Sequence, residues 1–70
     1  MKDNLDLAAS AQQLADAAPT GSIDRAAASS VAITLATTRD INDARKTLDG
    51  LTPAEVRTAA LDLFDRLSAD

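Results

Sequence analysis

The sequence contains no cysteine, no histidine, no tryptophan and no tyrosine. Without Cys or His the chain cannot supply a soft-ligand zinc site, a thiol redox pair, a Ser-His-Asp triad or a thiolate nucleophile. These absences exclude most classes of enzyme. We therefore expect a protein that is not an enzyme and that has no catalytic residue, no metal ligand and no cofactor.

Large apolar side chains are also scarce. The chain has 70 residues, enough for a single small helical domain over residues 1–70 and too few for a second core. Apolar residues make up 46% of it, but 16 residues are Ala and only 15 are Leu, Ile, Val or Phe. That share is close to the roughly 20% below which charged chains tend to stay unfolded. We therefore expect a second copy or a partner to help stabilise the fold.

Long hydrophobic runs are missing as well. No segment approaches the ~18 apolar residues needed to cross a bilayer, and no apolar stretch follows Met1 as it does in a secretory signal. We therefore expect a cytoplasmic protein with no membrane contact. The net charge is −4, which opposes binding to nucleic-acid phosphates and to anionic lipids. The expected partner is a protein with a basic or neutral surface.

The first segment predicts an amphipathic helix from Asn4 to Ala18. Its apolar residues at spacings of three and four form one stripe of a helix; they are Leu7, Ala11, Leu14 and Ala18. Asp3 or Asn4 can cap the start of this helix, and Pro19 with Gly21 ends it.

The second segment allows two interpretations. Ser22 is a candidate N-cap for a helix from about Ile23 to Thr37. However, the segment from Val31 to Thr38 alternates large apolar residues with Ala and Thr, and its β-branched content suits a strand as well. No turn-forming residue lies between Ala26 and Val31, so a strand would have to begin inside a run without a breaker. We favour the helix. In it Val31 and Leu35 lie opposite Ile33, which predicts an element that is apolar on two sides and central to the packing.

A short third helix is predicted from Ile41 to Asp49. Asp40 is its candidate N-cap, Ile41, Ala44 and Leu48 share a face, and Gly50 is suited to the C′ position. Alternatively, this segment continues the second helix after a kink near residues 37–39.

The last segment has the clearest helix start. Thr52 fits an N-cap, Pro53 the first helical position and Glu55 the third position of a capping box, while Leu51 and Val56 fit a hydrophobic staple. A helix from Pro53 to about Ser68 follows.

The apolar face of this last helix is wider than one stripe. Its seam is Val56, Ala60, Leu63 and Leu67, and Leu61 and Phe64 widen it, so the helix should have neighbours on two sides. Because a chain of this length has few large residues to cover both flanks, we expect an interaction surface and a homodimer contact formed by Val56, Leu61, Leu63, Phe64 and Leu67.

Acidic residues carry no catalytic or metal pattern. Asp3, Asp6, Asp16 and Asp24 lack the EF-hand spacing, and capping and solvation explain them. Asp62 and Arg66 are spaced for an i,i+4 ion pair on an exposed face. Ser22 invites comparison with the phosphopantetheine-bearing serine of acyl carrier proteins, but the Asp-Ser-Leu signature is replaced by Gly21-Ser22-Ile23, and an N-cap role explains it.

The expected fold is therefore all-α, a small bundle of three or four helices. The alternative is a ribbon-helix-helix-like α+β dimer, which the layout of a strand at 31–38 followed by two helices resembles. In that alternative the basic residues Arg39, Arg45 and Lys46 would contact DNA phosphates. The nearby acids cancel their positive charge within the same stretch; they are Asp40, Asp43 and Asp49. A helix-turn-helix version would present Thr52, Glu55, Arg57 and Thr58 to the groove.

Together these features predict a non-catalytic helical protein–protein interaction module or small regulatory protein that self-associates. The alternative function is a small dimeric DNA-binding regulator, such as the DNA-binding half of an antitoxin.

Overall fold

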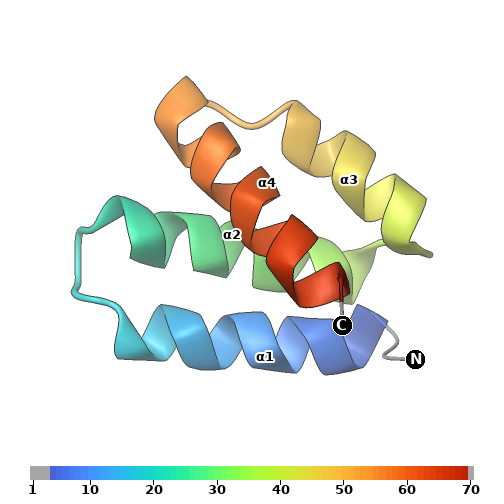
Figure 1. The fold of residues 1–70 in the computed structure, drawn as a ribbon, viewed down its shortest axis with the longest axis horizontal. Helices are drawn as coiled ribbons and strands as arrows, with labels where there is room; N and C mark the ends of the chain where they lie inside the picture. The colour runs from blue at the N-terminus through green and yellow to red at the C-terminus, as the bar shows by residue number, and fades with distance from the viewer. Residues whose placement is uncertain (1–3, 70) are drawn as a thin grey trace.

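Four α-helices make up the described part of the chain, residues 4–69 of a computed structural model (Figure 1). They are α1 (Asn4–Ala17), α2 (Ile23–Thr37), α3 (Ile41–Asp49) and α4 (Ala54–Ser68). No strand occurs between residues 4 and 69. The predicted all-α bundle is therefore confirmed, with four helices. The ribbon-helix-helix alternative is wrong, because the segment that would form its strand is the second half of α2.

α2 is the central element. It contacts each of the other three helices: α1 runs beside it in the opposite direction, and α4 crosses it (Figure 1). Its inward face buries Val31 and Leu35, whereas Ile33 is 64% exposed. The central position and the two apolar sides are as predicted, but no neighbouring helix of the described chain covers the side of Ile33.

The core is a single cluster to which all four helices contribute. Its members are Leu7, Ala8, Ala11, Ala27, Val31, Ala32, Leu35, Ala44, Leu48, Ala60 and Phe64. More than half are Ala, whose small side chain lets helix backbones approach closely but buries little area. Phe64, Leu7, Leu35 and Leu48 therefore fill most of the interior.

The buried stripe of α1 is rotated from the predicted one. Leu7 and Ala11 are buried as expected, but Ala8 and Ala15 complete the stripe, and Leu14 is 45% exposed. The reason is that α1 packs mainly against α2, so the side chains that face α2 are buried, whatever their size. The described part of α1 begins at Asn4, the first described residue, and the candidate cap Asp3 lies outside the described residues.

Two of the predicted N-caps are confirmed. The Ser22 hydroxyl accepts a hydrogen bond of 3.1 Å from the backbone N–H of Arg25, and the Asp40 carboxylate accepts one of 2.9 Å from that of Asp43. Each bond satisfies a backbone donor that has no partner within its helix. Residues 38–40 separate α2 from α3, so the alternative of one kinked helix is wrong.

The predicted start of α4 is off by one residue. Pro53 is the N-cap, with extended backbone, and no side chain caps the helix; the Pro53 carbonyl accepts the N–H groups of Val56 and Arg57, each at 3.1 Å. The capping box of Thr52 and Glu55 is therefore not formed. The shift is possible because a proline suits both the residue that flanks a helix and the first residue within it.

The two glycines differ in backbone conformation. Gly21, between α1 and α2, has a φ of 84°, the left-handed region that favours glycine. Gly50 closes α3 with a φ of −96°, and its N–H donates to the carbonyl of Thr47 at 3.2 Å. Gly50 thus ends α3 as predicted, but without the left-handed conformation of a C′ glycine.

Within residues 4–69, no helix combines the length and apolar character that a membrane span requires.

Candidate interaction surface

The residues predicted as an interaction surface on α4 divide into two groups. Phe64 is 1% exposed and lies in the core, so its prediction as a surface residue is wrong. Leu61, Leu63 and Leu67 are half-buried and pack against the core, and Val56 is half-buried as well. The wide apolar arc of α4 serves packing inside the chain, since α4 contacts α2, α3 and α1.

Arg45 of α3 helps to cover Phe64. Its guanidinium carbon lies 5.6 Å from the centroid of the Phe64 ring, within the range of a cation–π contact. The same guanidinium pairs with the Asp65 carboxylate of α4. The sequence shows Arg45 only as a charge close to acids on its own segment, because the contacts that occupy it are 19 and 20 residues away.

Exposed large apolar side chains occur on α1 and α2. Within residues 4–69 the large ones are Leu5, 68% exposed, Leu14, 45%, Ile23, 46%, and Ile33, 64%. The sequence reasoning missed all four as surface residues. Helical spacing identifies a stripe, but it cannot say which edge of that stripe a neighbouring helix leaves bare.

The exposed face of α2 carries no charge. Around Ile33 it presents Ala26, Ser29, Ala36 and Thr37, and residues 26–38 contain no Asp, Glu, Lys or Arg. A surface helix ordinarily has charged and polar residues opposite its buried side. We call this surface, formed by Ala26, Ser29, Ile33, Ala36 and Thr37, the neutral face of α2.

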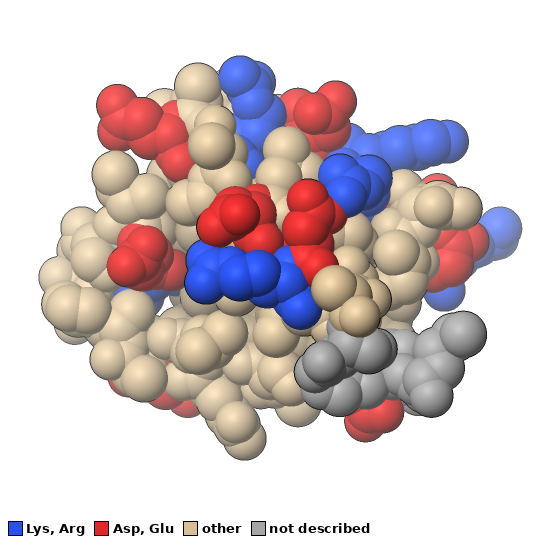
Figure 2. All heavy atoms as spheres, viewed as in Figure 1, with Lys and Arg blue, Asp and Glu red and all other residues tan. Residues whose placement is uncertain are grey.

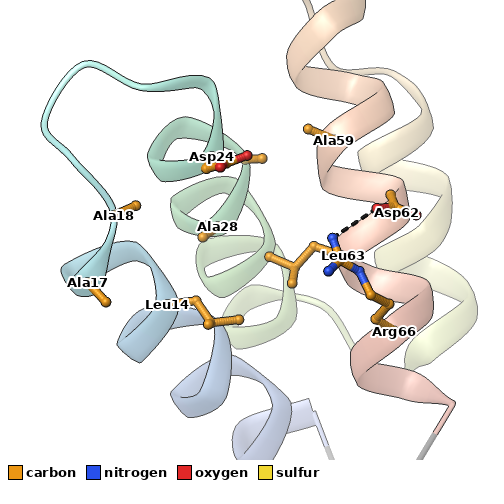
Figure 3. Close-up of a pocket in the computed structure, with 10 residues that line it drawn as sticks. Leu14, Ala17, Ala18, Asp24, Ala28, Ala59, Asp62, Leu63 and Arg66 are labelled. Carbon is orange, nitrogen blue, oxygen red and sulfur yellow. Dashed lines mark hydrogen bonds and ion pairs between the residues drawn. The ribbon is translucent and has the colours of Figure 1, made fainter.

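A groove lies between α1, α2 and α4 (Figure 3). Its volume is about 360 Å³, and its lining is Leu14, Ala17, Ala18, Asp24, Ala27, Ala28, Ala59, Asp62, Leu63 and Arg66. Ala27 and Ala28 of α2 are buried at its base. Leu14 of α1 and Leu63 of α4 project toward the space from opposite sides. The groove exists because α2 and α4 place alanines here.

The rim of the groove is polar. The Arg66 guanidinium donates to the Asp62 carboxylate at 2.9 Å, the i,i+4 pair predicted from the sequence. Asp24 lies in the first turn of α2. No cation within residues 4–69 pairs with Asp24, so the rim has one ion pair and one further carboxylate.

Charges are unevenly distributed over the molecule. On the face shown in Figure 2, acidic and basic side chains alternate over α3 and α4, and much of the remaining surface is uncharged. α1 contains the acids Asp6 and Asp16 and no Lys or Arg. The first turn of α2 adds Asp24 and Arg25, so among the described residues the side of the molecule formed by α1 and the start of α2 has three acids and one base.

The described part of the chain contains no cluster of acidic side chains suited to a metal ion. Among residues 4–69 no three acidic side chains gather closely enough to hold a metal ion; Asp3, one of the four acids considered above, lies outside these residues. The Ser22 hydroxyl is occupied locally, since it donates to the Pro19 carbonyl at 2.7 Å and accepts from Arg25.

The residues predicted for a helix-turn-helix surface lie at the start of α4. Thr52, Glu55 and Thr58 are exposed and Arg57 is half-buried. Of the three basic residues considered for the ribbon-helix-helix alternative, Arg45 is paired with Asp65. The helix-turn-helix interpretation stays a prediction.

Comparison of the chain with protein-family models, curated proteins and solved structures found no match.

Proposed function

We propose that this chain is a non-catalytic helical module that self-associates and binds another protein. The observation that carries the proposal is the neutral face of α2, with Ile33 64% exposed at its centre. Burying an isoleucine of this exposure removes apolar area from water, which favours association. An uncharged face also permits two copies to meet without bringing like charges together.

The choice of α2 as the self-association face follows from the burial of α4. Phe64 is in the core, and Leu61 and Leu63 are only partly exposed. A contact between two copies through α4 would therefore bury little additional apolar area. The small residues Ala26, Ser29 and Ala36 beside Ile33 allow two helices to approach closely in a symmetric pair.

A negative substitution at Ile33 tests the self-association. Ile33→Asp introduces a charge into the centre of the contact, and in a symmetric dimer the two new carboxylates lie close to each other. Because Ile33 is exposed, the monomer should keep its fold, which far-UV circular dichroism checks. Gln13→Asp is the matched control, since it adds the same charge at an exposed position of α1.

Sedimentation equilibrium measures the outcome. We expect a homodimer at micromolar concentration, dimerisation weakened by about tenfold or more in Ile33→Asp, and little change in Gln13→Asp. A clean monomer at hundreds of micromolar for the unaltered chain would refute self-association. Equal weakening by both substitutions would refute the assignment to α2, because added charge alone would then explain the effect.

A further inference from the structure

The groove between α1, α2 and α4 is large enough for side chains of another molecule. Its volume of about 360 Å³ is near the lower end of the ~300–1,000 Å³ of ligand sites. That space suits a few large side chains and not a whole helix. An occupant would insert part of its surface and keep the rest outside.

The shape of the groove is a trough. α2 forms its base, and α1 and α4 form its two sides (Figure 3). Leu14, 45% exposed, and the half-buried Leu63 leave apolar area on opposite walls. An amphipathic helix places apolar side chains one turn apart on one face, which is how helices bind apolar grooves. The trough could therefore receive two such side chains between Leu14 and Leu63.

The charge of the rim decides which helix fits. The Asp62 carboxylate already forms an ion pair with Arg66 at 2.9 Å, whereas Asp24 has no cationic partner among residues 4–69. Asp16 on α1 adds a second carboxylate to this side, and the Arg25 guanidinium donates to the Ala18 carbonyl at 3.2 Å and pairs with neither carboxylate. A positive group beside Asp24 would gain a new attraction, and a negative group would be repelled.

We propose that the groove binds one amphipathic helix of a partner protein, which inserts two large apolar side chains one turn apart and places a Lys or Arg beside Asp24. The proposal rests on the proposed function, because it names the partner that such a module binds. The groove fits this partner better than a second copy, because the exposed large apolar residues of the described chain, Leu5, Leu14, Ile23 and Ile33, lie nine or more residues apart on α1 and on α2, and no helix of a second copy exposes two of them one turn apart.

Three synthetic helical peptides of about 15 residues test the proposal with the full chain. The first has two leucines four residues apart flanked by lysines, with alanine and glutamine elsewhere; the second has glutamate and the third glutamine in place of the lysines. Titration is followed by the backbone amide signals of the chain in ¹H–¹⁵N spectra. We expect saturable shifts at Ala27, Ala28, Ala59 and Leu63 with the lysine peptide, and binding about tenfold or more weaker with the glutamate peptide.

Two variants of the chain locate the charge. Asp24→Asn should weaken binding of the lysine peptide by about threefold, as expected for loss of one exposed ion pair. Asp43→Asn is the matched control, because Asp43 lies in the first turn of α3 and away from the groove lining; it should leave the affinity unchanged. Circular dichroism confirms that both variants fold.

Any other outcome of these titrations contradicts a specific part of the proposal. If the glutamate or glutamine peptide saturates the same residues as tightly as the lysine peptide, the basic partner is wrong and the protein-binding function stands. Equal weakening by the two Asn variants would refute the position beside Asp24. If no peptide gives saturable shifts at the groove, it is not a helix-binding site, while the sedimentation experiment on Ile33 still decides self-association separately.

Discussion

Residues of the same chemical kind have different environments in this small protein. Phe64 and Ile33 are both large and apolar, yet the first is 1% exposed and the second 64%. Alanines at the helix contacts, such as Ala11, Ala44 and Ala60, are completely buried. The few large side chains in the interior therefore account for most of the buried apolar area, and stability should depend strongly on each of them.

Phe64→Ala should be among the most destabilising single substitutions. Removing a buried aromatic ring loses its transfer free energy and leaves a cavity, which together cost about 3–5 kcal/mol. That is comparable to the whole stability expected of a domain of this size. Urea denaturation followed by circular dichroism should find Phe64→Ala largely unfolded without denaturant. At low protein concentration, the free energy of unfolding of Ile33→Ala, at an exposed position, should lie within about 0.5 kcal/mol of that of the unaltered chain. Equal losses at both positions would contradict the burial described here.

The two glycines should respond to alanine in opposite directions. The backbone at Gly21 has a φ of 84°. An alanine there would have to adopt this left-handed conformation, which costs an L-residue roughly 1–2 kcal/mol. At Gly50, with a φ of −96°, an added Cβ would lie 3.6 Å from the Thr47 carbonyl oxygen, an ordinary contact, and the less flexible unfolded chain should stabilise the fold by about 0.4–1 kcal/mol. Thermal denaturation of both variants measures this, and a higher midpoint for Gly21→Ala than for Gly50→Ala would contradict it.

At the scale of the helix, the ends are defined by different means. α2 and α3 start with side-chain caps, from Ser22 and Asp40, whereas α4 starts at Pro53 without one. The C-cap of α2 is Thr38, whose N–H and hydroxyl both donate to the Thr34 carbonyl, at 3.1 and 2.7 Å. The linkers are therefore short because the helix ends are fixed locally.

Replacing each of the three candidate cap residues by alanine should distinguish the two that cap a helix from the one that does not. Ser22→Ala and Asp40→Ala should each lower stability by about 1 kcal/mol, because each leaves a backbone N–H at a helix start without its acceptor. Thr52→Ala should have an effect close to zero, since Thr52 is exposed and caps no helix. Chemical denaturation of the three variants gives the comparison. A loss for Thr52→Ala as large as that for Ser22→Ala would mean that α4 begins at Thr52.

For the whole molecule, net charge opposes the association that the apolar surface favours. The chain carries −4, and its longest dimension is 30 Å. In an associated pair, charges near the contact thus lie within a Debye length of about 30 Å at 0.01 M salt, and mostly beyond the 3 Å of 1 M salt. Self-association and binding of a basic partner should therefore respond to salt in opposite directions.

Raising the salt concentration should strengthen the homodimer. Screening removes repulsion between two acidic copies while the apolar contact at α2 remains. Sedimentation equilibrium at ionic strengths of about 0.01 M and about 1 M should give a lower dissociation constant at high salt, and binding of the lysine peptide should weaken over the same range. A homodimer that dissociates as salt increases would instead indicate a contact held by ion pairs between copies.

The sequence by itself determined the local structure. The bounds of α2 and α3, the caps Ser22 and Asp40 and the Asp62–Arg66 pair were all predictable, because each depends on residues within about one helical turn of each other. The helical identity of Val31 to Thr37 was also predictable, since no residue before it could turn the chain. Helix order followed from these local signals, whereas the sequence left the number open between three and four.

Only the tertiary structure decided which side of each helix is covered. It buried Ala15 and left Leu14 exposed, placed Phe64 in the core, and left Ile33 bare. It also assembled the groove from three helices, with Leu14, Asp24 and Leu63 far apart in the sequence. Periodicity fixes the angle between residues on one helix, but the direction of the buried side depends on where the other helices pack, and that depends on contacts across the whole chain.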